Sequence, residues 1–512
     1  MTSTGPRGSR GDAIGGGIEV RGGVAGTAAR LEDLARAGAV LRRLGEQVGE
    51  QARVVLAVLA DPGFLASAPR ALRTFLVAQA ALREAAAGPH GLLPAAARLD
   101  ALGCAVRAAA AGYRAAEGMA EIASRGVPWT VGYTLGRLGG AGVGATGLAL
   151  LPALAVASGA SGASAPGDPA PGCASRPLLR GGPGRAAAGV LGRHAAAVEV
   201  AAAAAPGALT GLLASLGLVP SGGPVADVPG LARTLSTAGA LSPWLRESAL
   251  VRVSTAGPGV DARAPAGLAD LAARIATLAP DGAGRVCAPG ASAGRARLRV
   301  ERIEAAGGRR AWVVEIPGIR TWSPRAGSQP LDLTGAVHAM AGRPTAASEA
   351  VRGALRAAGA RPGEPVLLAG HSEGGMAAAL AAADPATRRE FDITHVVTFG
   401  APISGSDLPR GVQVLAVEHT DDVVPRLDGA ADPDRPTWVT VSRDAGADPM
   451  PRGSRDPLAA AHSLAGYART AAAVDVSTNP SVRAWRDGAA AFFPGPGARV
   501  HSVEVLAERA RP

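Results

Sequence analysis

The sequence predicts an α/β fold with a mostly parallel sheet in its C-terminal part, preceded by a largely α-helical region. From residue 291 onward, short apolar runs alternate with helical segments, as in folds whose helices cover a parallel sheet. Before residue 280, apolar residues recur mainly at three- or four-residue steps, which is the period of a helix. The two patterns together indicate helices first and a sheet second.

Residues 24–137 are expected to form a helical bundle. Their apolar stripe is interrupted at Asp61-Pro-Gly63 and at Gly88-Pro-His-Gly91, which predicts three antiparallel helices. Residues 1–23 are expected to be disordered. They lack the apolar core of a signal peptide, so general secretory export is not expected.

The composition of the middle of the chain indicates a boundary between domains. No charged residue occurs from Leu138 to Gly167, and this stretch fits a membrane-associated helix, a buried hairpin or a linker, because a spanning helix needs about 20 strongly apolar residues. The rest of the segment 138–185 is rich in Gly, Ala, Ser and Pro and is expected to be a flexible connector. In residues 186–290 the apolar residues again recur with the period of a helix. This region is expected to lie over the active site as a lid or to dock the helical bundle onto the catalytic region.

The predicted catalytic region, residues 291–512, alternates strands and helices. A turn at Gly307-Gly308 indicates a hairpin between its first two strands. Helices are expected at 331–340 and 348–358, and strands at 297–303, 312–316, 366–370, 395–400 and 412–417, with later strands at 438–442 and 503–506.

A strand-to-helix turn in this region carries a serine. An apolar run leads into Gly370-His-Ser-Glu-Gly374 and then into an alanine-rich helical pattern. Such a turn needs Gly370 and Gly374 so that neighbouring backbone can pass close to Ser372. The pattern is typical of a nucleophile elbow, which suits acyl transfer.

The partners that a nucleophilic serine needs follow downstream. A serine hydroxyl needs an imidazole to take its proton and a carboxylate to orient that imidazole. We assign these roles to His462 and Asp422, in the Ser, Asp, His order that α/β-hydrolases use. Asp421 competes for the acid role, because adjacent residues on a loop point in different directions, although Asp422 directly precedes Val-Val-Pro425.

Two backbone amides are expected to form an oxyanion hole. The strand that ends at Pro317-Gly318 is followed by Ile319, whose amide is predicted to act with that of Glu373, the residue after the serine. The amides opening the helix also favour negative charge beside the serine.

From about Arg297 onward, the chain resembles bacterial, actinobacterial-type α/β-hydrolases of the esterase and class 3 lipase type. The resemblance rests on residues 370–375, 396–402 and 422–425, and on His462 with Tyr467 five residues on. It implies an α/β-hydrolase fold and an ester-cleaving activity. Two positions depart from it: Ile319 stands where members commonly carry a small hydroxylated residue, and Glu373 where many carry a neutral one.

Composition narrows the range of partners. The net charge of +10 is carried by arginine, since the chain has no lysine, and only 3% of residues are aromatic. Scattered arginines without stacking residues do not indicate a nucleic-acid partner. The positive charge is compatible with binding to an anionic membrane surface. No His, Cys and carboxylate cluster has metal-ligand spacing, and no phosphate or dinucleotide loop follows a strand, so no metal and no cofactor are expected.

The sequence thus predicts a serine hydrolase that acts on small-molecule or lipid acyl esters, with acyl transfer to an alcohol left open. The alternative is a membrane-associated or exported interaction protein whose hydrolase domain is weakly active. Residues 24–125 faintly resemble type VII secretion substrates, and Tyr113 with Glu117 matches their export pattern, although such a pair also occurs as a plain helix-surface pair. The sequence is compatible with three locations: the cytoplasm, the surface of a membrane, and the outside of the cell after type VII export.

Overall fold

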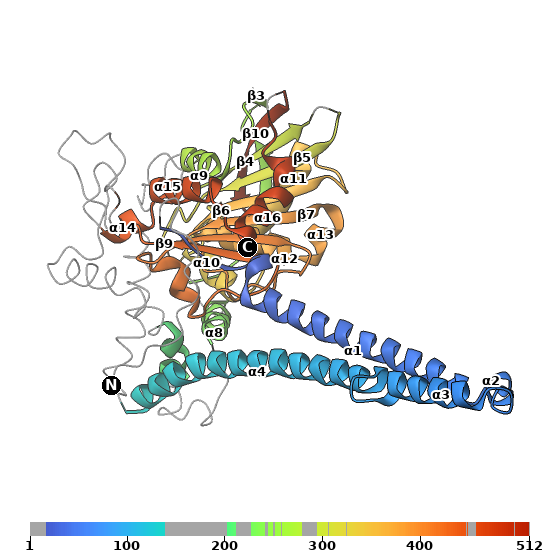
Figure 1. Ribbon diagram of the computed structural model, residues 1–512. Helices are drawn as coiled ribbons and strands as arrows, with labels where there is room; N and C mark the ends of the chain where they lie inside the picture. Colours follow the sequence, from blue (N-terminus) through green and yellow to red (C-terminus); the bar gives the residue numbers. More distant parts are fainter. Residues whose placement is uncertain are drawn as a thin grey trace. The chain divides into compact units, whose positions relative to one another are not determined.

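A computed structural model gives the fold (Figure 1). It describes residues 17–138, 202–210, 227–240, 244–248, 251–278 and 294–510, apart from residues 258, 306, 324, 447, 449–456 and 496. The chain divides into two compact units, one formed by Ala25–Ala123 and one by the remainder. The predictions for residues 1–16 and 139–185, including the uncharged stretch and the connector, lie outside the described residues.

Long helices make up the smaller unit. They are α1 (Thr27–Val58), the short α2 (Pro62–Ala66), α3 (Leu72–Ala87) and the part of α4 (Leu92–Leu138) up to Ala123. The breaks lie where the sequence predicts them, but α2 is additional. Asp61 caps it by accepting a hydrogen bond from the amide of Phe64 at 2.9 Å, and Pro62 suits the first turn because the missing N–H needs no partner there. No helix within the described ranges is long and apolar enough to cross a membrane.

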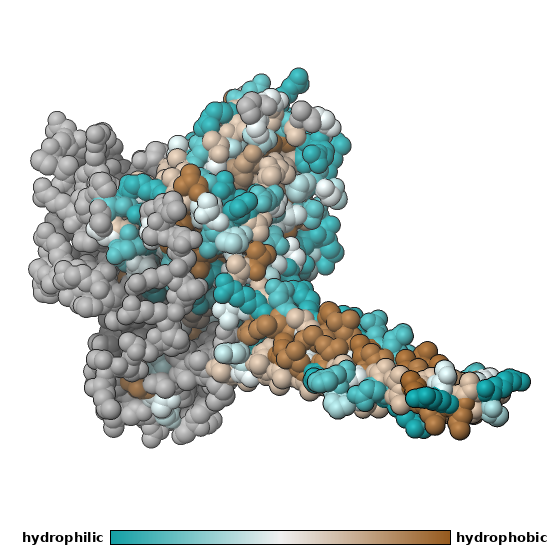
Figure 2. Space-filling view, in the orientation of Figure 1, coloured by the Kyte–Doolittle hydropathy of each residue, from teal (hydrophilic) through white to brown (hydrophobic). Residues whose placement is uncertain are grey.

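Helices α1 and α4 approach each other closely through glycine. A Cβ atom added to Gly103 would lie 2.6 Å from the carbonyl oxygen of Gly38, and one added to Gly45 would lie 3.0 Å from that of Ala96. These pairs run in opposite directions along the chain, so the two helices are antiparallel. Small residues form this seam, and large apolar side chains of α1, α3 and α4 are exposed (Figure 2), among them Leu34, Val40, Leu44, Val54, Val58, Leu72, Leu76, Val77 and Leu102.

The larger unit has a mixed α/β fold built on a ten-stranded sheet with the order β1-β9-β8-β7-β6-β5-β4-β10-β2, in which β3 also pairs with β10. The five strands from β9 to β5 are parallel, and antiparallel strands extend both sides. The strands are β1 (Glu19–Gly22), β2 (Val251–Thr255), β3 (Val260–Ala262), β4 (Ala296–Glu304), β5 (Arg310–Ile316), β6 (Pro365–His371), β7 (Asp392–Phe399), β8 (Gln413–His419), β9 (Trp438–Arg443) and β10 (Arg499–Arg509).

Helices cover both faces of the sheet, each over its own hydrophobic core. Helices α11 (Ala346–Ala358) and α12 (Glu373–Ala383) pack on one face. Helices α9 (Leu268–Thr277), α15 (Leu464–Asp475) and α16 (Pro480–Gly488) pack on the other. The central strands are therefore apolar along most of their length. The remaining elements are α8 (Val228–Ala240), α10 (Leu333–Met340), α13 (Pro385–Glu390), α14 (Pro457–Ala461), η1 (Gly23–Ala25), η2 (Val424–Asp428) and η3 (Ala490–Phe492).

Two expectations about the segments before the catalytic region need correction. Residues 1–23 were expected to be disordered, but Glu19–Gly22 pairs with β9 as an edge strand, because Ile18 and Val20 pack against the core. Residues 186–290 were expected to be helical, and α8 and α9 are helices there, but β2 and β3 both pair with β10. Their alternating valines suit strands, and the long β10 leaves an edge for them to extend.

Candidate active site

Ser372 occupies a strained turn between β6 and α12. Its backbone φ is +54° and ψ is −126°, a conformation that costs energy for a residue with a Cβ atom. Neighbouring glycines make the turn sterically feasible. A Cβ on Gly370 would lie 2.3 Å from the carbonyl oxygen of Gly374, and one on Gly374 would lie 2.4 Å from that of Pro317. The fold therefore holds a serine at the carboxyl edge of the sheet in a geometry that a relaxed loop would avoid.

The structure brings Asp422 and His462 together. Oδ2 of Asp422 accepts hydrogen bonds from Nδ1 of His462 and from the hydroxyl of Tyr467, each at 2.6 Å, and Oδ1 accepts one from the amide of Val424 at 2.9 Å. Burial raises the pKa of Asp422, but the charge and hydrogen bonds of its partners outweigh this and lower the pKa below its ordinary value. Asp421 instead accepts from the amide of Ala445 at 3.1 Å.

The hydrogen bond to Asp422 determines how the imidazole of His462 can act. Nδ1 carries the proton that it donates to the carboxylate, so Nε2 of the neutral ring keeps its lone pair. Within the described part of the chain, Nε2 is buried and has no hydrogen-bond partner. A buried, unpaired basic nitrogen is able to accept a proton from a nearby hydroxyl.

His371 links the turn at Ser372 to the loop of His462. Its Nε2 donates to the backbone oxygen of His462 at 3.0 Å, and the two rings lie 4.6 Å apart. Burial, and then the neighbouring His462, lower the pKa of His371 to about 3, so its ring is neutral. Since His371 directly precedes Ser372, this hydrogen bond holds His462 beside the turn.

The loop after β5 runs against the serine. A Cβ atom built on Gly318 would lie 3.1 Å from the Cβ of Ser372 and 3.0 Å from Nδ1 of His371. The next residue, Ile319, is buried, and Glu373 opens α12 on the other side of the serine. Glu373 thus directly follows Ser372, and Ile319 follows the glycine that packs against it.

The comparisons with known proteins address the same part of the chain. Residues 310–431 match the family model of lipase (class 3). These residues form a class 3 lipase domain. The match suggests an ester hydrolase, and the family implies lipid ester substrates. Comparisons with curated proteins and with solved structures found no match.

The class 3 lipase domain ends before the end of the site. The matched range contains Ser372 and Asp422, whereas His462 and Tyr467 lie beyond it. It also leaves out the long helices, so the likeness of residues 24–125 to type VII secretion substrates stays a prediction.

Two features of the candidate site and its surroundings were not foreseen from the sequence. Tyr467 was recognised by its spacing from His462, but its hydrogen bond to Asp422 was not foreseen; its ring also stacks on His419 at 4.0 Å. The other is a buried charge cluster around Arg509, described below. Within the described ranges, no group of three or more His, Cys, Asp or Glu residues has the arrangement of a metal site.

Proposed function

We propose that this protein is a serine esterase or lipase that cleaves carboxylic esters through an acyl-serine intermediate. The observation that carries the proposal is the buried hydrogen bond between Asp422 and His462, with the second imidazole nitrogen unpaired, next to the strained turn at Ser372. Together these features provide a nucleophile, a base and an acid that orients the base.

The proposed chemistry follows from these roles. Nε2 of His462 takes the hydroxyl proton while Oγ of Ser372 attacks the ester carbonyl carbon. The amides of Ile319 and Glu373 stabilise the resulting oxyanion. His462 then gives its proton to the leaving alkoxide, the ester C–O bond breaks and the acyl-serine remains. Water, activated in turn by His462, releases the acid and restores the serine.

Lipid or other apolar acyl esters are the proposed substrates, because they are what the class 3 lipase family implies. The same acyl-serine would transfer its acyl group to an alcohol in place of water. A comparison of product acids and esters in the presence of added alcohol would separate the two outcomes.

A fluorophosphonate probe tests the proposal directly, because it reacts with activated serines. Peptide mass spectrometry should find the adduct on Ser372 of the purified full chain and on no serine of Ser372→Ala. His462→Ala should react at least about a hundredfold more slowly, since its serine lacks a base. Absence of labelling in folded wild-type protein would overturn the proposal and favour an interaction protein with an inactive hydrolase domain.

A further inference from the structure

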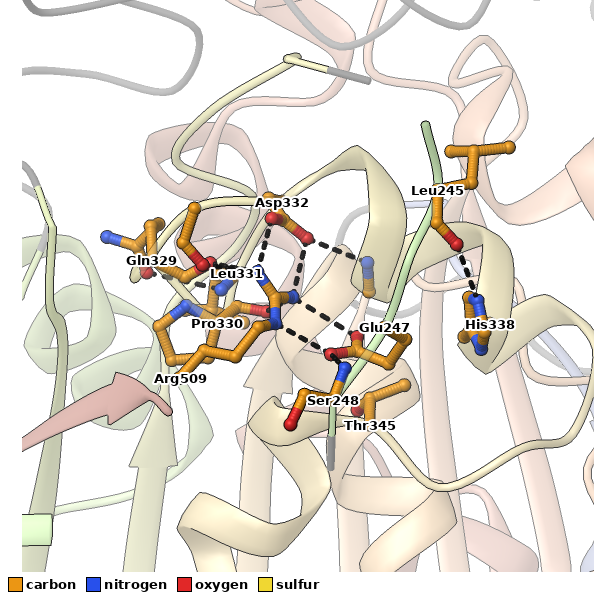
Figure 3. Close-up of polar contacts among 12 residues, drawn as sticks. Leu245, Glu247, Ser248, Gln329, Pro330, Leu331, Asp332, His338, Thr345 and Arg509 are labelled. Carbon is orange, nitrogen blue, oxygen red and sulfur yellow. Dashed lines mark hydrogen bonds and ion pairs between the residues drawn. The ribbon is translucent and has the colours of Figure 1, made fainter. Parts of the chain in front are cut away.

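A buried charged cluster is centred on Arg509 at the end of β10 (Figure 3). The guanidinium is 1% exposed. It donates to both oxygens of Asp332, at 2.6 and 2.8 Å, and to both oxygens of Glu247, at 2.6 and 3.1 Å. We call Arg509, Asp332, Glu247 and Glu373 the Arg509 cluster. Such paired, two-point contacts hold a guanidinium in a fixed orientation.

The Arg509 cluster is hydrogen-bonded to the loop that carries Ile319, residues 317–332. Besides Asp332, Arg509 donates to the backbone oxygens of Gly327 at 3.0 Å and Gln329 at 2.9 Å. The far end of the loop is joined to its start, since the amide of Arg320 donates to the oxygen of Leu331 at 2.9 Å. The amide of Leu333 likewise donates to the oxygen of Thr321 at 3.1 Å, so restraint at residues 327–332 reaches the neighbour of Ile319 directly.

Glu373 connects the same loop to the serine. Its Oε1 accepts a hydrogen bond from the amide of Asp332 at 3.2 Å, and its backbone directly follows Ser372. A Cβ on Gly335 would lie 2.6 Å from this oxygen, so the carboxyl group is tightly enclosed. The loop and the first turn of α12, which would supply the two oxyanion amides, are thus joined through one buried side chain.

Charge counting indicates the protonation state of Glu373. The Arg509 cluster holds one guanidinium and three carboxyl groups, of which Asp332 and Glu247 already contact the cation. Among the described residues, His338 on α10 also lies near the cluster; it bonds to the oxygen of Leu245 and has a pKa that burial lowers, so it adds no positive charge. A third buried carboxylate would be uncompensated. Burial accordingly raises the pKa of Glu373 well above its ordinary value.

We propose that Arg509 is a positioning residue for the oxyanion loop and that Glu373 joins this loop to α12 as a neutral acid. The inference rests on the proposed function, because it concerns the loop that carries Ile319. Arg509 and Glu247 lie outside the class 3 lipase domain, residues 310–431, so the segments that flank the domain supply the cation and one of its counter-ions.

Arg509→Met and Arg509→Lys test the first part, with p-nitrophenyl butyrate as the probe. Arg509→Met should lower kcat roughly 10- to 100-fold with KM changed less than about threefold, because an oxyanion hole acts in the transition state. Arg509→Lys should recover part of kcat. The matched control is Arg499→Met, at the exposed start of the same strand, which should leave kcat unchanged. Unchanged kcat in folded Arg509→Met would overturn the proposal.

Substitutions at Glu373 test the second part and do not depend on whether Arg509→Met folds. Glu373→Gln keeps an uncharged acceptor for the amide of Asp332 and should retain more kcat than Glu373→Leu does. Glu373→Leu removes the acceptor and should lose about tenfold or more. Equal loss in both variants would show that the negative charge is needed and would overturn the neutral assignment.

Hydrogen exchange separates this inference from the proposed function. Peptides that cover residues 317–332 should exchange faster in Arg509→Met than in wild type or Arg499→Met, whether or not the enzyme is active. If wild type fails to react with fluorophosphonate but this difference appears, the proposed function fails and the loop restraint stands. If exchange is unchanged while Ser372 reacts, the positioning role of Arg509 fails alone.

Discussion

Nε2 of His371 donates a hydrogen bond to the backbone oxygen of His462 across 3.0 Å, although the two residues lie 91 positions apart in the sequence. This contact joins the turn of the proposed nucleophile to the loop of the proposed base. Since His371 is buried and neutral, it orients His462 without placing a positive charge beside it.

Replacing His371 should affect the rate more than substrate binding. His371→Leu removes the donor to His462 and should lower kcat about tenfold or more, because small displacements of a catalytic base are costly. His371→Gln retains an N–H donor and should lose less. Steady-state kinetics on p-nitrophenyl butyrate would measure both variants. Equal rates for wild type and His371→Leu would show that the contact is not needed.

The neighbouring acids Asp421 and Asp422 allow a comparison of two matched variants, in which each acid is replaced by its amide. Asp422→Asn should lower kcat by about 10³- to 10⁴-fold, because the amide favours the wrong tautomer of His462. Asp421→Asn keeps an oxygen acceptor for Ala445 and should stay within a few-fold of wild type. Equal large losses in both, with intact folding by circular dichroism, would argue against Asp422 as the orienting acid.

The close backbone packing around Ser372 predicts that Gly374 cannot be replaced. Gly374→Ala would place a methyl group 2.4 Å from the oxygen of Pro317, so either the turn or the oxyanion loop must move. We expect loss of fluorophosphonate labelling and a lower melting temperature. Gly411→Ala, where an added Cβ meets nothing within 4 Å, is the control and should label normally. Normal labelling of Gly374→Ala would contradict the packing described here.

The helical unit allows an independent test of its glycine seam. Gly103→Ala would clash with the oxygen of Gly38 at 2.6 Å, whereas an added Cβ at Gly112, on the same helix, meets nothing within 4 Å. Gly112→Ala should stabilise the helix by about 0.5–1 kcal/mol through propensity. Gly103→Ala should destabilise the unit instead. Thermal unfolding followed by circular dichroism would measure both, and the same sign for both would refute the predicted seam.

Buried acids make stability depend on pH. Burial raises the pKa of Asp428 to about 7, while an unfolded Asp titrates near about 3.9. The folded state therefore binds this proton more tightly, so the stabilisation is full below pH 4 and is lost as pH rises to about 7. Burial also raises the pKa of Glu315 to about 8, so the loss of stability continues as the pH rises to about 8.

Urea unfolding between pH 5 and 7 would measure this decline. Asp428→Asn mimics the protonated acid and should reduce the downward slope by up to about 1.4 kcal/mol per pH unit. Asp392→Asn, at an exposed position of β7, should leave the slope unchanged. A slope that is identical in wild type and Asp428→Asn would exclude Asp428 as a source.

The helix breaks and most strands were predictable because their causes are local. Pro62 follows the end of α1 and Pro89 follows the end of α3, because proline cannot continue a helix. Strands covered on both faces are recognisable as short apolar runs. The serine turn was also predictable, because only glycines at Gly370 and Gly374 allow such close backbone contacts. The strands β1, β2 and β3 were missed, since each is short and exists only because a longer strand offers it an edge.

The sequence by itself determined which residue types stand in which order: a serine on a glycine-flanked turn, two adjacent acids after a strand and a histidine beyond them. Only the tertiary structure decided that Asp422 contacts His462 while Asp421 turns to Ala445, because adjacent side chains on a loop point in different directions. It alone brought Arg509 to Asp332, 177 residues away in the chain. Contacts over such separations depend on how strands assemble, and no local pattern of residues encodes them.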